Sequence, residues 1–361
     1  MNKKYFIIVP ADTPHGPIKG AYALANSLVG VGRDVTIVSV KTGKGAKANL
    51  DAAVKKICLA DYASGYFNKL TLYRSMLSKA GTRDEVASIS MCFSADAINL
   101  ACKRQSITCS SVRANLIENY RMDYGLLGII LAVTHLSALR FFDKVVVMNQ
   151  SMARQVEKYI GKYPNVIGNF IDEKTLEHIP IVRLFDNNMR FIFVGSLSKR
   201  KRPWMVIKAI KSLLSKGLVV QLDILGDGPL RSKMEDKIVR YKLSTFVRLY
   251  GFQEKPYEFL KNADVMVLPS LSEGASRSVM EALYLGIPCV MADMDGNSEL
   301  VIDGYNGALF NTPDELENAM LRAVQISRNF QNSRPILLPE NNRQTYAVSI
   351  FIRMLENSLI L

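Results

Sequence analysis

The chain has few of the residues that build metal sites and disulfide frameworks. It contains 5 cysteines and 3 histidines in 361 residues, and no two cysteines form a C-x-x-C pair. An odd number of scattered thiols excludes a disulfide scaffold and a zinc ribbon, and favours a reduced protein in the cytosol. No ligand cluster for a divalent metal is recognised either, so we expect no metal and no cofactor.

Long uncharged apolar runs are also missing. No stretch of 18 such residues occurs, so no membrane-spanning helix is expected. The opening segment Met1–Val9 has an apolar run too short for a signal peptide and leads into Pro10, which favours a first β-strand. The most apolar predicted helix, 125–142, fits either a core helix or one that dips into a membrane surface. His135 within it is expected to be a buried, hydrogen-bonded residue.

Positive charge is concentrated in the first part of the chain. Residues 1–200 hold 27 Lys and Arg against 15 Asp and Glu, whereas residues 201–361 hold 19 against 18. This imbalance indicates an anionic ligand or surface, such as phospholipid headgroups or a lipid diphosphate. Nucleic acid is the competing interpretation, but no RRM, KH or zinc pattern is present, so no nucleic-acid partner is expected. Ordinary solubility charge is the third possibility.

Segment 41–56 is rich in lysine and glycine. It is expected to be a basic loop that passes into a helix, on the side where a membrane-bound acceptor would arrive; a plain solvated loop is the alternative. Lys41, Lys44 and Lys47 are therefore candidates for the acceptor side of a site.

Strand and helix patterns alternate in both halves of the chain. In the first half, strands are predicted at 5–9, 35–40, 87–93, 107–112 and 144–148, with helices at 21–31 and 125–142 and a polar ligand-binding loop at 113–124. In the second half, strands at 190–195, 220–225, 246–250 and 264–268 alternate with helices at 203–215, 230–241 and 256–262. Such alternation predicts an α/β protein with doubly wound parallel sheets. We expect two Rossmann-like domains, 1–170 and 171–340, followed by a C-terminal segment, 341–361, whose amphipathic helix crosses back onto the first domain.

The most informative stretch joins a buried strand at 263–268 to a helix that ends before Gly286. The connecting turn contains Gly274, and Ser276 or Ser278 is available to cap the helix. A helix N-terminus after a glycine turn binds anions through its N–H groups and its dipole.

Two acids, Glu273 and Glu281, flank that helix start in an E-x7-E spacing. Glu281 falls about one turn inside the helix. Carboxylates accept hydrogen bonds from sugar hydroxyls, so a nucleoside-diphosphate sugar lying along the turn would suit both acids. Two solvated acids on a surface helix would give the same bare spacing.

Further short blocks occur in order on both sides of this stretch: Phe193–Gly195, Leu222–Pro229, Val247–Phe252, Asp264–Ser270, Glu273–Gly274, Met280–Ala282, Gly286–Pro288 and Glu299–Gly307. Together they resemble the C-terminal domain of the retaining glycosyltransferases of family 4, which have the GT-B fold. The first half of the chain matches more loosely. The resemblance implies two Rossmann-like domains that face each other across a cleft.

The resemblance also implies roles for single residues. Glu273 would contact the transferred sugar, Glu281 the ribose, and Lys201 would neutralise the donor diphosphate. The remaining donor-binding candidates are Gly16, Ser196, Phe252, Gly274, Ala275 and Ser276. The chain departs from the family pattern at three positions.

At the first of these positions, His15-Gly16 replaces a Gly-Gly pair, which makes His15 an acceptor-side candidate or a solvent-facing residue. At the second, Ser196 replaces an arginine, although Lys199, Arg200 and Arg202 are close in sequence. Where relatives carry a histidine, Arg113 stands instead; it could pair with a phosphate and is the third catalytic candidate, beside Glu273 and Lys201.

The sequence therefore predicts a metal-independent, retaining glycosyltransferase of the GT-B fold. The donor would be a nucleotide sugar, with a UDP-sugar favoured over a GDP-sugar. The acceptor would be a lipid-linked glycan of surface polysaccharide biosynthesis. The protein is expected in the cytoplasm, peripheral on the anionic inner face of the plasma membrane. A transferase acting on a diacylglycerol or inositol lipid is one alternative, and a non-catalytic sugar-nucleotide-binding subunit of a partner transferase is another.

The expectation of metal-free chemistry is directly testable. Transfer from the preferred nucleotide sugar should continue unchanged in excess EDTA, because no set of oxygen ligands is predicted. The measurement is the rate of nucleotide release with and without chelator. Activity that is lost in EDTA and restored by Mg²⁺ would contradict it.

Overall fold

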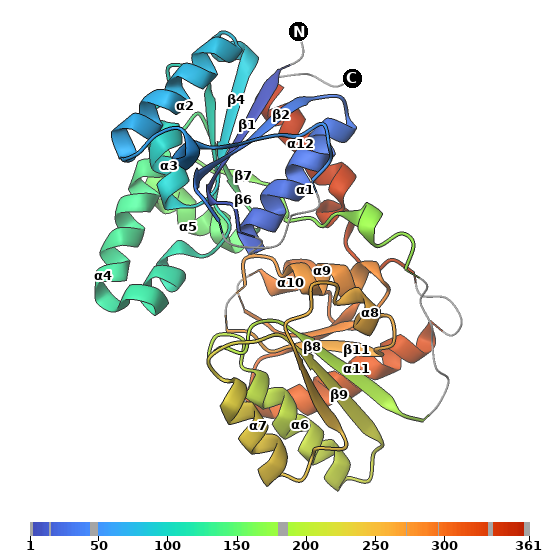
Figure 1. Cartoon of the computed structure of the whole chain (residues 1–361). Helices are drawn as coiled ribbons and strands as arrows, with labels where there is room; N and C mark the ends of the chain where they lie inside the picture. The colour runs from blue at the N-terminus through green and yellow to red at the C-terminus, as the bar shows by residue number, and fades with distance from the viewer. Residues whose placement is uncertain are drawn as a thin grey trace. The chain divides into compact units, whose positions relative to one another are not determined.

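A computed structural model describes residues 3–13, 16–43, 50–179, 187–271, 273–294, 296–330 and 335–356. The chain forms two compact units (Figure 1). One unit contains Met1–Ile171 together with Asn341–Leu361, and the other contains Asp172–Glu340. Each is built on a parallel sheet with helices packed on its faces, as expected for a doubly wound α/β fold.

The sheet of the first unit has seven strands in the order β3-β2-β1-β4-β5-β6-β7, all of them paired in parallel. The strands are β1 (Lys4–Ala11), β2 (Asp34–Lys41), β3 (Lys55–Cys58), β4 (Val86–Ser90), β5 (Ile107–Ser111), β6 (Lys144–Val147) and β7 (Asn165–Val166). All five residues of β4 are buried, because helices cover both faces of a parallel sheet.

The helices of this unit are α1 (Gly16–Gly30), α2 (Tyr66–Ala80), α3 (Phe93–Leu100), α4 (Leu116–Ala138), α5 (Gln150–Ile160) and α12 (Gln344–Glu356). Helix α1 begins five residues earlier than predicted. Pro17 lies in its first turn, where a missing N–H costs no hydrogen bond.

Three other predictions in this unit are wrong in part. The strand predicted at 87–93 ends at Ser90, because Cys92 has a left-handed φ of 74° and Phe93 begins α3. Lys55–Cys58 forms an edge strand beside β2 where a helix was expected. The predicted polar loop 113–124 is helical from Leu116, since the Asn115 side chain accepts a hydrogen bond from the Glu118 N–H at 3.1 Å and caps the helix.

Helix α4 differs most from its prediction. Gly125 adopts a non-helical conformation (φ 62°, ψ −138°) and separates an arm at 116–124 from an arm at 126–138. The segment Leu116–Phe141 is long and apolar enough to cross a membrane by length and composition, although no such helix was predicted. Only 28% of its most apolar window is buried, so it is not the core helix that was one of the two interpretations.

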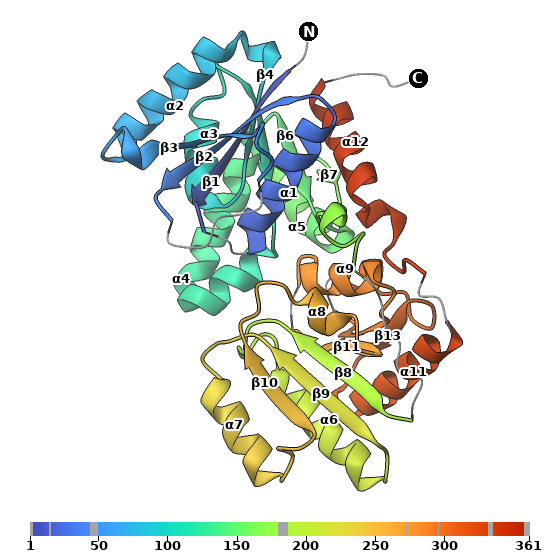
Figure 2. The same ribbon diagram turned by 45° about the vertical axis from the view of Figure 1, so that its right-hand side comes forward.

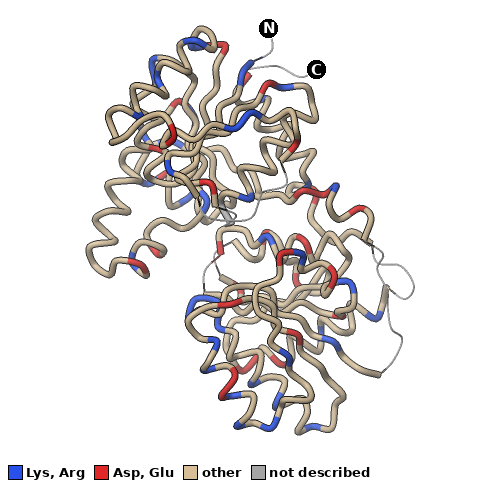
Figure 3. The backbone as a smooth tube through the Cα atoms, in the orientation of Figure 1, with Lys and Arg blue, Asp and Glu red and all other residues tan. Residues whose placement is uncertain are grey.

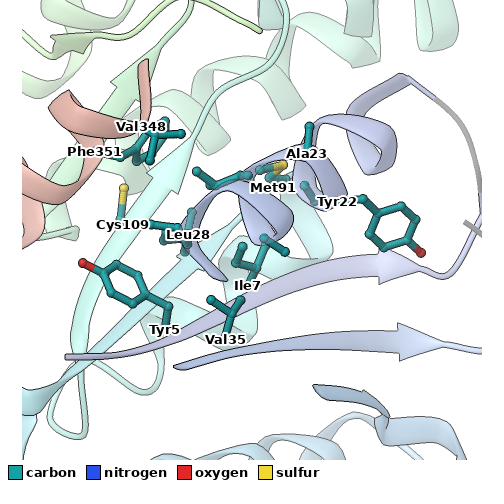
Figure 4. Packing of buried hydrophobic residues seen from close by; sticks show 14 of the residues in the cluster. Tyr5, Ile7, Tyr22, Ala23, Leu28, Val35, Met91, Cys109, Val348 and Phe351 are labelled. Atoms are coloured by element: carbon teal, nitrogen blue, oxygen red, sulfur yellow. The ribbon is translucent and has the colours of Figure 1, made fainter. Parts of the chain in front are cut away.

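Helix α12 belongs to the core of the first unit although it lies near the other end of the sequence. It packs against α1 (Figure 2), and its buried Val348 and Phe351 join one cluster with Tyr5 and Ile7 of β1 (Figure 4). Glu356 at its end receives two hydrogen bonds from the Arg33 guanidinium, at 2.8 and 2.9 Å, and one from the Tyr5 hydroxyl at 2.7 Å.

The second unit has a six-stranded parallel sheet in the order β10-β9-β8-β11-β12-β13. Its strands are β8 (Met189–Val194), β9 (Val220–Leu225), β10 (Val247–Gly251), β11 (Val265–Leu268), β12 (Cys289–Ala292) and β13 (Gly307–Phe310). Its helices are α6 (Pro203–Ser215), α7 (Arg231–Arg240), α8 (Tyr257–Leu260), α9 (Arg277–Tyr284), α10 (Asn297–Leu300) and α11 (Leu316–Asn329). The predicted bounds of β9 and α6 coincide with the observed ones.

The Glu356 contacts generate a prediction about the first unit. Although burial raises the pKa of Glu356, its hydrogen bonds to Arg33 and Tyr5 and the charge of Arg33 bring that pKa below its ordinary value. The contribution to stability is therefore present at neutral pH and is lost as pH falls through the lowered pKa. Glu356→Gln should speed amide exchange in α12 and β1 by about 5–30-fold at pH 7.

Hydrogen-exchange mass spectrometry measures this effect peptide by peptide. Peptides from α6, in the other unit, serve as the internal control and should be unchanged. Equal exchange of α12 and β1 in the variant and the parent protein would show that the Glu356 contacts add nothing.

Candidate active site

The loop between β11 and α9 is held by the burial of the two elements that it joins. All four residues of β11 are buried, as are Val279, Met280 and Leu283 of α9. The helix ends at Tyr284, and Gly286 follows with a left-handed φ of 71°. Glu281 lies one turn inside the helix, as predicted from the spacing.

Ser276 occupies the N-cap position of α9, but its side chain does not cap the helix. The Ser276 hydroxyl lies 3.2 Å from that of Ser278, and Ser278 donates to the Val194 carbonyl at 3.0 Å. These contacts tie the start of α9 to the end of β8. The Ser276 side chain therefore does not occupy the start of α9, and N–H groups at a helix start suit an anionic ligand.

Glu273 and Lys201 form a buried ion pair in the second unit. The Lys201 ammonium donates to Glu273 Oε1, and an Arg200 guanidinium nitrogen lies 3.5 Å from the same oxygen. The Glu273 side chain is 7% exposed and that of Lys201 is 11% exposed. Two residues separated by 72 positions are therefore brought together at the carboxyl edge of the sheet.

Burial and charge act in opposite directions on Glu273. Burial raises the pKa of Glu273, but the charges of Lys201 and Arg200 outweigh it and hold that pKa below its ordinary value. Burial also lowers the pKa of Lys201, against the opposing charge of Glu273. The Glu273 carboxylate is therefore ionised at neutral pH and keeps the buried ammonium paired.

The position of Lys201 depends on close packing between loops. The Leu271 N–H donates to the Arg200 carbonyl at 2.8 Å, and Arg202 Nε donates to the Pro269 carbonyl at 2.5 Å. On the other side, Gly226 has a φ of 138°, and a Cβ there would come within 1.9 Å of the Gly195 carbonyl oxygen. Gly226 thus lets the loop after β9 lie directly on the loop after β8.

The remaining donor-side candidates lie around the same edge of the sheet. The Glu281 carboxylate oxygen Oε1 lies 4.0 Å from the Arg277 guanidinium nitrogen Nη2. Burial, together with the charge of Glu281, raises the pKa of Tyr257. Phe252 follows β10 and is 68% exposed. Ser196 is exposed after β8 with its hydroxyl 3.1 Å from that of Ser198. Gly274 and Ala275 are half-buried in the turn before α9.

The candidates in the first unit follow the strands of its own sheet. Gly16 begins α1, and Lys41 is the exposed last residue of β2. Arg113 follows β5, and its guanidinium lies over Gly20, where an added Cβ would be 2.0 Å from Arg113 Nη2. His15, Lys44 and Lys47 lie outside the described residues.

His135 is buried, as expected, and hydrogen-bonded on both ring nitrogens. Its Nε2 lies 2.7 Å from Asp96 Oδ2, and its Nδ1 lies 3.1 Å from the Tyr120 hydroxyl.

Sequence reasoning missed a polar pocket in the first unit. This cavity of about 280 Å³ is lined by Asp12, Ser39, Thr42, Gly43, Lys56, Cys58 and Asp61. The Lys56 ammonium and the Tyr22 hydroxyl both contact the Asp12 carboxylate. The lining residues are scattered along the sequence. They meet because they lie in or just after β1, β2 and β3, which are neighbours in the sheet.

The prediction of no metal site overlooked the D-x-D spacing at Asp293-Met294-Asp295. Asp293 follows β12, and Asp295 lies outside the described residues. Within the described ranges, no group of three or more His, Cys, Asp and Glu side chains is arranged to hold a metal ion.

Known proteins resemble this chain in sequence and in fold. Residues 175–333 match the family described as "Glycosyl transferases group 1". A stretch of 152 residues is 33% identical to the UDP-Gal:alpha-D-GlcNAc-diphosphoundecaprenol alpha-1,3-galactosyltransferase of Escherichia coli, covering 40% of this chain and 38% of that protein. The chain spans at most about half the length of the first curated relatives that it matches.

Solved structures resemble the whole chain. The lipopolysaccharide outer core galactosyltransferase WaaB superposes with a TM-score of 0.70 at 18% identity, covering 99% of this chain and all of that one. HepE of Anabaena, solved with UDP-glucose, gives a TM-score of 0.72 at 15% identity, with 98% and 100% covered. At these identities the likeness shows the fold, which is GT-B. Residues 175–333, which make up most of the second unit, therefore match the group 1 glycosyltransferases, the family 4 enzymes, and the fold of the whole chain resembles their GT-B structures.

Proposed function

We propose that the protein is a retaining glycosyltransferase that moves a hexose or N-acetylhexosamine from a UDP-sugar to a lipid-linked glycan on the cytoplasmic side of a membrane. The observation that carries the proposal is the buried Lys201–Glu273 pair beside the start of α9. Both groups stand at the carboxyl edge of a parallel sheet, where α/β proteins bind nucleotides.

The leaving group in this reaction is a nucleoside diphosphate, and its developing negative charge must be stabilised. Lys201, Arg200 and the first N–H groups of α9 supply positive charge and donors from fixed positions. The ionised Glu273 keeps Lys201 oriented and offers an acceptor to the hydroxyls of the transferred sugar. Glu281, one turn deeper, would accept from the ribose hydroxyls.

Two observations support a lipid-linked acceptor. The relative in Escherichia coli acts, by its name, on a diphosphoundecaprenol-linked sugar. In this chain the first unit carries 24 Lys and Arg against 12 Asp and Glu, which favours an anionic acceptor or surface. The pocket around Asp12 and Lys56 offers acceptors and donors for the hydroxyls of the acceptor sugar.

The proposed division of labour between the two acids can be tested by substitution. Glu281→Gln should weaken binding of the nucleotide, whereas Glu273→Gln should mainly lower kcat, because one acid would hold the ribose and the other the reacting sugar. Calorimetry with UDP and steady-state kinetics measure the two effects. Losses of affinity alone, equal in both variants, would contradict the assignment.

Lys201 offers a second test of the site. Lys201→Gln should lower kcat by about 10²–10³-fold, since it removes a fixed charge from the leaving group. Lys199→Gln is the matched control, because Lys199 is exposed two residues away and should leave kcat unchanged. Thermal denaturation of both variants checks that the loss of the Lys201 contact to the buried Glu273 has not unfolded the unit. A folded Lys201→Gln protein with full activity would refute the proposed role.

A further inference from the structure

The α4 hairpin, defined as residues 116–138 with its bend at Gly125, is folded back on itself. Gly128 in the second arm is so close to the first arm that an added Cβ would lie 1.8 Å from the Tyr120 carbonyl oxygen. The Tyr120 ring stacks on the His135 ring, with centroids 6.1 Å apart. In a straight helix these residues would be about 22 Å apart, so the two arms form a closed hairpin.

The hairpin is held to the rest of its unit by the inward face of the second arm. Ala132, His135 and Leu136 on that face are buried. The His135–Asp96 hydrogen bond joins this arm to α3, and the Ser90 hydroxyl donates to the other Asp96 oxygen at 2.5 Å. A buried polar network of this kind fixes the orientation of the hairpin.

The outward face of the second arm is apolar as well. Leu126 is 82% exposed, Leu127 70%, Ile130 63% and Leu131 46%. No Lys, Arg, Asp or Glu occurs from Gly125 to Leu139, and in Figure 3 this arm carries no charged residue. A helix that is apolar on both faces is typical of a protein core or a membrane, yet the structure leaves this face exposed (Figures 1 and 2).

The chemistry of this surface favours lipid over a protein partner. Its most exposed side chains, Leu126, Leu127, Ile130 and Leu131, are aliphatic, whereas protein interfaces are enriched in aromatic residues, Met and Arg. The second arm has 13 residues and is about 20 Å long, which is too short for the ~30 Å hydrocarbon core. Such an element would lie in the boundary between headgroups and acyl chains.

The net charge of the first unit is complementary to an anionic membrane. The first unit carries 12 more basic than acidic residues, although the second arm itself contains no Lys, Arg, Asp or Glu. Arg121, Asp123 and Tyr124 stand just before the bend, and Arg140 follows the second arm. Tyrosine and arginine at the ends of an apolar segment are typical of residues placed at the headgroup level.

We propose that the outward face of the α4 hairpin, formed by Leu126, Leu127, Ile130 and Leu131, inserts into one leaflet of an anionic bilayer. The hairpin then anchors the first unit by apolar insertion, with the net positive charge of that unit contributing attraction. The proposal does not depend on transferase activity, because binding to vesicles needs neither donor nor acceptor.

A tryptophan placed in the hairpin reports insertion directly. The chain has one tryptophan, Trp204, in the second unit, so Trp204→Phe combined with Leu127→Trp carries a single probe at the tip. With vesicles of phosphatidylglycerol and phosphatidylcholine, the emission should shift to shorter wavelength and brominated acyl chains should quench it. The matched control is Trp204→Phe with Val239→Trp, an aliphatic residue that is also 70% exposed but lies in α7 of the second unit. The control should show neither effect.

Sedimentation with the same vesicles measures the strength of binding. Leu127→Gln combined with Ile130→Gln should weaken binding by at least about tenfold, since two side chains no longer gain from leaving water. Binding of the parent protein should weaken in 1 M NaCl but persist, because screening removes the charge attraction and not the insertion.

Four results would overturn the proposal. Sedimentation without quenching of the tip tryptophan, or complete release by salt, would mean that charge alone holds the protein. A dimer in analytical ultracentrifugation that the double glutamine variant abolishes, with no vesicle binding, would identify a second copy as the occupant of this surface. Failure to bind vesicles of any composition would leave no lipid role for the hairpin.

Discussion

The burial of both faces of two parallel sheets is the constraint on which the rest of this structure depends. Parallel strands must be joined by helices that cover the sheet, so every strand delivers its following loop to the same edge. In the second unit the loops after β8 and β11 meet there and bring Lys201 to Glu273. The ion pair at the candidate site is thus a product of topology, since 72 residues separate its members.

This constraint also explains how much could be predicted from the sequence. Strand β11 is an uninterrupted apolar run, and β9 alternates apolar with polar residues in its first half; both were located to within a residue or two. The helix start after Gly274 followed from the local glycine, serine and apolar pattern. The pairing of Lys201 with Glu273 could not be predicted from local sequence patterns. It depends on hydrogen bonds between loops, such as that from the Leu271 N–H to the Arg200 carbonyl, and these have no recognisable sequence pattern.

The first unit was harder to predict because single residues decide its local structure. The bend at Gly125 turns one long apolar pattern into two packed arms, and a helical pattern alone does not show where the chain reverses. The capping contact of Asn115 makes a helix of a segment whose polar and aromatic residues suggested a loop. Lys55–Cys58 became a strand because an unpaired edge of β2 was available, which outweighs weak local propensity.

The division of the chain has a consequence for its synthesis. The first unit is discontinuous: it contains residues up to Ile171 and then those from Asn341 onward. Its hydrophobic core includes Phe351, and the Tyr5 hydroxyl donates a hydrogen bond to Glu356, 351 residues away in the sequence. During synthesis on the ribosome, the N-terminal segment therefore cannot complete its core until α12 has been made. Part of its apolar surface stays uncovered while the second unit emerges as one continuous stretch. The unit made first is the last to be completed.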